Sequence, residues 1–144
     1  KSYAKMSEII QASKDAFIYN EIKKLDQNFD TMLGERGINL SGGQIQRISI
    51  ARGLIKDPDI ILFDDCLSSV DTDTEENILN NLATKFNKKT KLIISHRISS
   101  VKTADRILVI KDGMIIEQGK HDELIRLNKY YKKIFDKQIG DKKK

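Results

Sequence analysis

The chain of 144 residues has one proline, one cysteine and no tryptophan. A single cysteine, Cys66, excludes a disulfide within the chain and fits a reducing compartment. No apolar run approaches the roughly 20 residues that a membrane-spanning helix needs, and the first residues do not resemble a signal peptide. Because 33% of the residues are charged and 39% are hydrophobic, we expect a soluble globular domain, or part of one, rather than a disordered chain.

The net charge is +5, and much of this excess lies in lysines near the end of the chain, at positions 132, 133, 137 and 142–144. Basic ends can bind nucleic acid or anionic lipid. No aromatic side chains alternate with these lysines as a stacking surface for bases would require. We therefore expect a solvated tail and no nucleic-acid partner.

Two adjacent glycines stand at the start of a predicted helix in the stretch Leu40-Ser41-Gly42-Gly43-Gln44. Ser41 is a good N-cap, and Gln44 three residues later completes a capping-box pattern. Glycines lack the Cβ atoms that would keep an anion away from the backbone N–H groups at a helix start. The pattern predicts either an ordinary capped surface helix, reaching about Lys56, or an anion site.

An apolar run, Ile60 to Phe63, follows the helix-ending Asp57-Pro58-Asp59 and leads into Asp64 and Asp65. It shows no polar alternation, so we expect a strand covered on both faces, as in a parallel α/β sheet. Carboxylates at the C-terminal end of a buried strand lie where a magnesium–nucleotide site needs them. The alternative is a buried strand followed by a solvated turn.

The remaining pattern predicts alternating helices and strands. Helices are expected within residues 3–25, from residue 72 to about 86, at 99–104, at 121–127 and around 130–135. Strands are expected at 91–95, 106–110 and 114–118. The last two should form a hairpin, because Lys111-Asp112-Gly113 is a tight turn of the Asp-Gly type.

These segments, in this order, resemble the motifs of ABC-type ATPases, and the resemblance covers nearly the whole chain. The matching segments are the signature motif at 40–44, the Walker B strand at 60–64, the D-loop at 68–71, the switch-histidine strand end at 93–97, the exporter segment at 31–37 and the exporter-type closing segment at 113–124. The resemblance implies an α/β fold: a partial RecA-like P-loop ATPase core, with parallel strands and a C-terminal hairpin, plus part of the ABC helical subdomain. We expect the helical subdomain portion at residues 1–57 and the core at 58–144.

The resemblance also implies a site for ATP and Mg²⁺. Asp64 would hold Mg²⁺ through water, while Asp65 and His96 would be the catalytic residues, with His96 contacting the γ-phosphate. A second nucleotide-binding domain would hold the ATP that the signature binds in trans, and the two domains would meet at an interface. The residues implied are Leu40, Ser41, Gly42, Gly43 and Gln44 for the signature, and Ser69 and Asp71 for the interface.

Position 65 departs from the family pattern, which has glutamate as the presumed general base. Asp65 is one methylene shorter, and a carboxylate drawn back by about 1.5 Å positions water poorly, because catalytic groups need placement to within about 0.5 Å. The departure resembles the degenerate-site half of heterodimeric ABC exporters, whose intact signature serves the competent site of its partner. His96 is retained here, although some degenerate halves lack it.

The sequence contains no Gly-x-x-x-x-Gly-Lys-Ser/Thr phosphate loop. By the resemblance, we expect the C-terminal portion of a nucleotide-binding domain, attached to a transmembrane domain at the cytoplasmic face of the cell membrane. The parent would be an ATP-hydrolysing exporter, whereas this chain alone would be inactive. The absent phosphate-loop strand would interrupt the sheet between the His96 strand and the strand at 106–110.

Two other functions are open. The chain could act as a non-hydrolysing module that donates its signature to a partner. It could also belong to a soluble ABC ATPase of DNA repair or translation. Against the second reading stand the residues at 44–47, the loop at 34–37 and the closing segment at 113–124.

Overall fold

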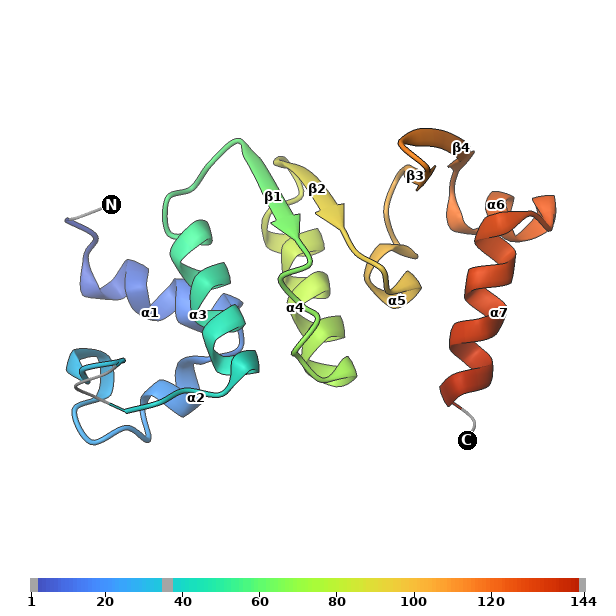
Figure 1. The fold of residues 1–144 in the computed structure, drawn as a ribbon. Helices are drawn as coiled ribbons and strands as arrows, with labels where there is room; N and C mark the ends of the chain where they lie inside the picture. Colours follow the sequence, from blue (N-terminus) through green and yellow to red (C-terminus); the bar gives the residue numbers. More distant parts are fainter. Residues whose placement is uncertain (1–2, 35–37, 143–144) are drawn as a thin grey trace. The chain divides into compact units, whose positions relative to one another are not determined.

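The computed structural model describes residues 3–34 and 38–142 (Figure 1). It divides into two compact units, Lys1–Ile94 and Ser95–Lys144, and each is described by itself. The boundary expected after residue 57 lies inside the first unit and stays a prediction. Three residues of the exporter-like loop, 35–37, lie outside the described residues.

The first unit begins with a group of helices, and the sequence predicts all of them except the 3-10 helix at residues 28–30. They are α1 (Met6–Asp15), α2 (Tyr19–Ile22), the 3-10 helix η1 (Asn28–Asp30) and α3 (Gly42–Leu54). Helix α1 lies against α3 (Figure 1). Ile18, Ile50 and Leu54 are buried, and they join the core beneath the strands of the same unit.

Two parallel strands follow, β1 (Ile60–Asp64) and β2 (Thr90–Ile94), joined by α4 (Thr72–Lys85). The register pairs Leu62 with Leu92. Ile61 and Phe63 share one core with Ile78 and Leu82 of α4, and both α4 residues are fully buried. The predicted parallel α/β arrangement is confirmed for this pair of strands, as Figure 1 shows.

The prediction that both faces of β1 are covered is wrong for the described part of the chain. Ile60 and Leu62 are 68% and 59% exposed, and Leu92 and Ile94 on the neighbouring strand are 54% and 50% exposed. Side chains alternate between the faces of a strand, so burying Ile61 and Phe63 leaves these residues on the opposite face. An unbroken apolar run shows that both faces of a strand could be buried. Whether the second face is buried depends on another layer of the structure, which the run itself does not determine.

The second unit contains α5 (Ile98–Val101), β3 (Ile107–Lys111), β4 (Met114–Gly119), α6 (His121–Leu127) and α7 (Tyr130–Lys142). The expected hairpin is confirmed: β3 and β4 are antiparallel, with Asp112 and Gly113 at φ 50° and 77° in the turn. Both central residues of a type I′ turn need positive φ, which Asp-Gly tolerates. Leu124 and Tyr131 pack in the core of this unit.

Two features bear on predictions about the sheet and the membrane. Among the described residues, the first unit holds the two-stranded sheet of β1 and β2 and the second unit holds the two-stranded sheet of β3 and β4, and the predicted interruption of the sheet stays a prediction. No described helix is both long enough and apolar enough to cross a bilayer.

Candidate nucleotide site

The N-terminus of α3 carries the capping box that the sequence predicts. The Ser41 hydroxyl accepts a hydrogen bond from the Gln44 backbone N–H at 3.3 Å, and the Gln44 side-chain oxygen accepts one from the Ser41 backbone N–H at 2.8 Å. Ser41 and Gly42 are exposed, and the glycine carries no Cβ. The first turn of α3 therefore faces outward with its partial positive charge.

Glu21 of α2 contacts the first turns of α3, which the sequence did not predict. Its carboxylate accepts a hydrogen bond from the Gln44 side-chain nitrogen at 2.7 Å and forms an ion pair with Arg47 at 2.5 Å. Arg47 also donates to the Phe17 carbonyl at 2.6 Å. The Glu21 carboxylate thus contacts two residues of α3, Gln44 and Arg47. Because Glu21 lies 23 residues before Gln44, no local sequence pattern predicts the contact.

Gly43 lies tightly against Ser69. A Cβ built at Gly43 would lie 2.8 Å from the Ser69 carbonyl oxygen, whereas one at Gly42 would make only ordinary 3.5 Å contacts with the Ser69 side chain. Because the obstructing atom at Gly43 belongs to the backbone, a side chain there would force the two segments apart. The two glycines therefore differ: Gly43 permits packing, and Gly42 leaves the outward side open.

Gln46 ties α3 to the segment that follows the two carboxylates. Its side-chain nitrogen donates to the Ser68 hydroxyl at 3.0 Å, and its oxygen accepts from the Ser69 backbone N–H at 2.9 Å. The Ser68 hydroxyl donates in turn to the Asp65 carbonyl at 3.0 Å. A chain of hydrogen bonds therefore runs from the helix with the exposed N-terminus to the residue after β1.

Asp64 and Asp65 lie at the C-terminal end of β1 with exposed side chains. The Asp65 backbone N–H donates to the Ile94 carbonyl at 2.9 Å, and its φ of 46° lies in the left-handed region, where aspartate is tolerated better than most residues. The described residues contain no group of three potential metal ligands. Mg²⁺ commonly takes one or two carboxylates, with waters and phosphate oxygens completing its shell, so these two fit such an ion.

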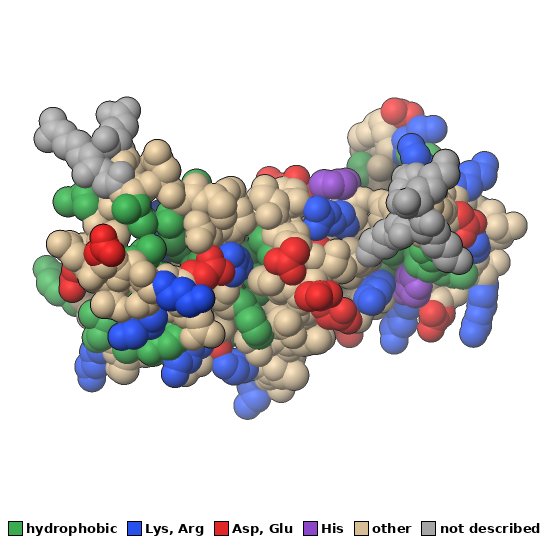
Figure 2. Space-filling model, turned by 90° about the horizontal axis from the view of Figure 1, so that it is seen from below, with side chains coloured by type: hydrophobic (Ala, Val, Ile, Leu, Met, Phe, Trp, Pro, Cys, Tyr) green, Lys and Arg blue, Asp and Glu red, His purple; other side chains and the backbone are tan. Residues whose placement is uncertain are grey.

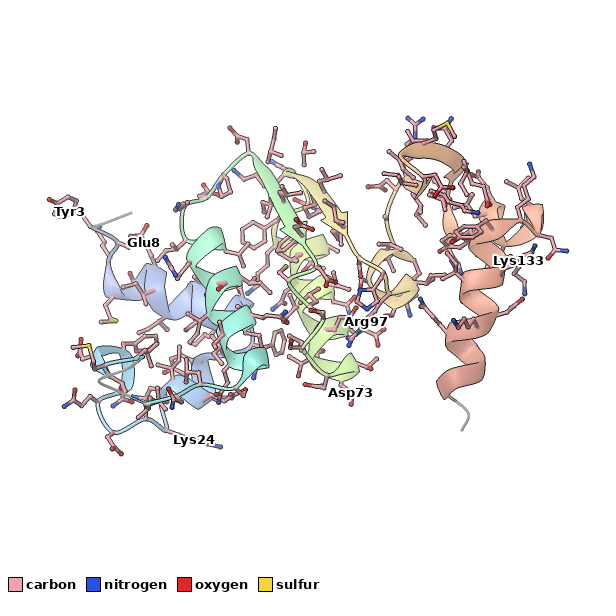
Figure 3. All side chains as sticks on the ribbon, in the orientation of Figure 1. Tyr3, Glu8, Lys24, Asp73, Arg97 and Lys133 are labelled. Carbon is pink, nitrogen blue, oxygen red and sulfur yellow. The ribbon has the colours of Figure 1, made fainter. Side chains whose placement is uncertain are left out.

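Asp71 is the N-cap of α4. Its carboxylate accepts a hydrogen bond from the Thr74 backbone N–H at 2.9 Å, and this bond holds the pKa of Asp71 below its usual value. Asp73 follows in the first turn of the same helix, at the end labelled in Figure 3. Ser69 and Asp71 both lie just before α4, and the structure gives Asp71 the role of N-cap; their place at an interface stays a prediction.

Charges of both signs lie on the face of the first unit that Figure 2 shows. On the face drawn in Figure 2, acidic and basic side chains lie interspersed over this unit, with green hydrophobic side chains between them. Among the described side chains, that face shows no continuous basic stripe of the kind that would attract a nucleic-acid backbone.

Comparison with known proteins finds ABC transporter proteins among those similar to this chain. The family model described as ABC transporter matches residues 3–68. The ABC transporter ATP-binding protein YknU of Bacillus subtilis is 49% identical over 140 residues, which are 97% of this chain and 24% of that protein. The structure of a bacterial Atm1-family ABC exporter with ATP bound is 40% identical with a TM-score of 0.88, covering 96% of this chain and 24% of that one. Over nearly its whole length, the chain is similar to the ATP-binding part of ABC transporters.

The ATM1-type heavy metal exporter of Novosphingobium aromaticivorans is a further relative, 41% identical over 138 residues, which are 96% of this chain and 23% of the exporter. The chain thus spans about a quarter of the length of the relatives it matches. The mixed α/β fold expected from the resemblance agrees with the exporter structure. The ABC family binds nucleotides, so the motif residues above are candidates for that role.

His96, the candidate switch histidine, belongs to the second unit, whereas Asp64 and Asp65 belong to the first. Its side chain is exposed in the loop between β2 and α5, next to Arg97, which Figure 3 labels. The His96 carbonyl accepts a hydrogen bond from the Gln138 side chain at 2.7 Å. Gln138 lies on α7, 42 residues away, and sequence patterns gave no sign of this contact.

Proposed function

We propose that this chain forms part of the ATP-binding subunit of an ABC exporter and acts at an interface between two nucleotide-binding domains. Leu40, Ser41, Gly42, Gly43 and Gln44 would bind the γ-phosphate of ATP held by the other domain. The observation that carries the proposal is the N-terminus of α3, which is exposed, glycine-opened, capped and tied through Gln46 to the segment after Asp65. A helix N-terminus of this kind favours phosphate through its N–H groups and its dipole.

The carboxylates of Asp64 and Asp65, at the C-terminal end of β1, would serve a second nucleotide, which this chain itself binds. Asp64 would hold Mg²⁺ through water, and Mg²⁺ supplies neutralising charge for the β- and γ-phosphates when it is bound. Asp65 would face the water that attacks the γ-phosphate, and His96 would contact that phosphate and help to orient the water.

Asp65 should make hydrolysis slow at the site that this chain's own carboxylates serve. The shorter side chain leaves its carboxylate about 1.5 Å short of the place that a glutamate would reach, and misplacement by about 1 Å can cost a factor of 100 in rate. We infer that the chain's own site binds Mg-ATP and hydrolyses it slowly. Its signature segment would serve a second site that hydrolyses faster.

The partners would be a second nucleotide-binding domain and a transmembrane domain, and the chain would work at the cytoplasmic face of the membrane. The relatives include exporters of different cargo, among them a lipid A-core flippase of Pasteurella multocida and the heavy metal exporter. The cargo named for each belongs to that protein, and nothing in this chain selects among them.

A hybrid exporter tests the proposal. In it, this chain replaces the matching 138 residues of the Novosphingobium aromaticivorans exporter. We expect the hybrid to bind Mg-ATP, and Asp64→Asn to weaken Mg-dependent binding by at least roughly tenfold, because one metal-oriented carboxylate is lost. Asp73→Asn, at the exposed start of α4, is the control and should leave binding unchanged.

The proposal fails if a hybrid that reaches the membrane in normal amounts binds no Mg-ATP. It fails equally if Asp64→Asn and Asp73→Asn behave alike. Both outcomes are read from nucleotide binding, so slow hydrolysis by Asp65 does not obscure them.

A further inference from the structure

We propose that Gln138 is a positioning residue for His96, and that helix α7 thereby becomes part of the nucleotide site. This inference rests on the proposed function, because it is that function which gives His96 its role at the γ-phosphate. All residues involved lie in the second unit.

Gln138 uses both ends of its side-chain amide on one short stretch of backbone. Its nitrogen donates to the His96 carbonyl at 2.7 Å, and its oxygen accepts from the Ile98 backbone N–H at 2.9 Å. The two bonds enclose His96 and Arg97 in the way that a neighbouring strand would, although no strand pairs with this loop among the described residues. The Gln138 amide therefore makes the two backbone hydrogen bonds that a neighbouring strand would make to the chain just after β2.

Hydrogen bonds of Ser95 hold the loop on either side of the His96 peptide. The Ser95 hydroxyl accepts from the Arg97 backbone N–H at 3.0 Å and lies 3.2 Å from the Ser100 hydroxyl. These bonds fix the start of the loop and its continuation into α5, where Ile98 and Ser100 are buried. The His96 peptide lies between these points, and its carbonyl is held by Gln138.

Helix α7 is firmly attached to the core of its unit. Tyr131 is buried, its hydroxyl lies 2.8 Å from His121 Nδ1, and its backbone N–H donates to the Glu117 carboxylate at 3.1 Å. Ile134 and Phe135 also pack against this core. Gln138 is the next half-buried position along the helix, flanked by exposed Lys137 and Ile139. Because the first turns of α7 pack against this core, the helix places the Gln138 amide at a defined position beside the His96 loop.

The expected consequence is a defect in the chemical step rather than in ATP affinity. In the hybrid exporter, Gln138→Ala should lower kcat for ATP hydrolysis by roughly three- to tenfold, with KM unchanged within about a factor of two, because His96 acts where charge develops. Lys137→Ala, one position earlier on the exposed side of α7, is the matched control and should leave both constants unchanged.

A double-mutant cycle with His96→Ala distinguishes positioning from general stability. If Gln138 acts through His96, Gln138→Ala has no further effect once His96 is removed. Multiplied effects of the two changes would overturn the inference. If His96→Ala itself leaves the rate unchanged, the proposed role of His96 fails, which is a different result from a failure of Gln138.

Hydrogen exchange provides a readout that does not depend on activity. The Ile98 amide donates to Gln138, so Gln138→Ala should speed its exchange while Lys137→Ala leaves it protected. Gln138→Glu keeps an acceptor for Ile98 but loses the donor to the His96 carbonyl. It should therefore retain part of the Ile98 protection while lowering kcat as far as Gln138→Ala. Unchanged exchange at Ile98 in Gln138→Ala would overturn the inference whatever the rates show.

Discussion

The backbone N–H of Ser69 donates a 2.9 Å hydrogen bond to the side-chain oxygen of Gln46, and the same side chain donates to Ser68 at 3.0 Å. Helix α3 therefore carries both the proposed phosphate-binding turn and the residue that fixes the segment after Asp65. Two direct hydrogen bonds thus join α3 to that segment. In the proposed function, the first turn of α3 serves one nucleotide and Asp64 serves another. These hydrogen bonds would then connect the two nucleotide sites.

The close approach of Gly43 to Ser69 predicts opposite effects for two glycine-to-alanine changes in α3. Gly53→Ala should raise the free energy of unfolding by about 0.5–1 kcal/mol, because alanine favours helix and a Cβ there meets nothing within 4 Å. Gly43→Ala should lower it by about 1–3 kcal/mol, because its Cβ would lie 2.8 Å from the Ser69 carbonyl oxygen. Urea unfolding of the chain measures both. Stabilisation by Gly43→Ala equal to that of Gly53→Ala would refute the close contact.

Capping by Asp71 predicts a loss of stability in acid. Its pKa is lowered from the ordinary value of 3.8 by the bond from Thr74, so the folded state favours the carboxylate. This contribution is complete above pH 3.8 and is lost as the pH falls through the lowered pKa. Asp71→Asn keeps a capping oxygen but cannot titrate, so the melting temperature of the unmodified chain should fall relative to it in acid. Asp71→Ala should melt lower at neutral pH. Parallel acid curves for the unmodified chain and Asp71→Asn would contradict the assignment.

Cys66 should be a slow nucleophile. Burial, reinforced by the nearby carboxylates of Asp65 and Asp64, raises the pKa of its thiol to about 11. Alkylation by iodoacetamide at pH 8 should be at least roughly tenfold slower in the folded chain than in urea, because the thiolate is the reactive form. The rate should keep rising toward pH 11. Since the folded state favours the protonated thiol, its stabilising contribution is complete below the ordinary pKa of 9.0 and is lost as the pH rises to about 11. A rate that levels off near pH 9 would contradict this.

Lengthening Asp65 should restore hydrolysis. In the hybrid exporter, Asp65→Glu should raise the rate of ATP hydrolysis by ten- to about a hundredfold, because the carboxylate regains about 1.5 Å of reach. The backbone φ of 46° at this position suits glutamate less well, so a small drop in melting temperature should accompany the gain. Asp73→Glu is the control for an added methylene. An unchanged or slower rate in Asp65→Glu would remove the case for a weakened base.

Local features of this chain were predictable from its sequence, and contacts over long separations were not. The capping box of Ser41 and Gln44 and the turn at Asp112 depend on neighbours within three residues, so the sequence determines them. Glu21 and Gln138 contact their partners over 23 and 42 residues from positions with no distinctive pattern. The exposed face of β1 was also missed, because an apolar run cannot tell which of its faces another layer covers.

The central claim is that residues 40–44 act on ATP bound by another domain, and a mixed dimer of the hybrid exporter tests it most directly. One half carries Asp64→Asn. The other carries Gly42→Glu, which suits the first turn of a helix but repels phosphate. At Mg-ATP concentrations well below the weakened Kd, a dimer of two identical altered halves should retain almost no Mg-ATP, because every site then contains one defect. If the signature acts in trans, the mixed dimer has one site with both defects and one intact site, and it should retain one Mg-ATP per dimer. No retained Mg-ATP in a correctly assembled mixed dimer would mean that both elements act on the same nucleotide from one chain.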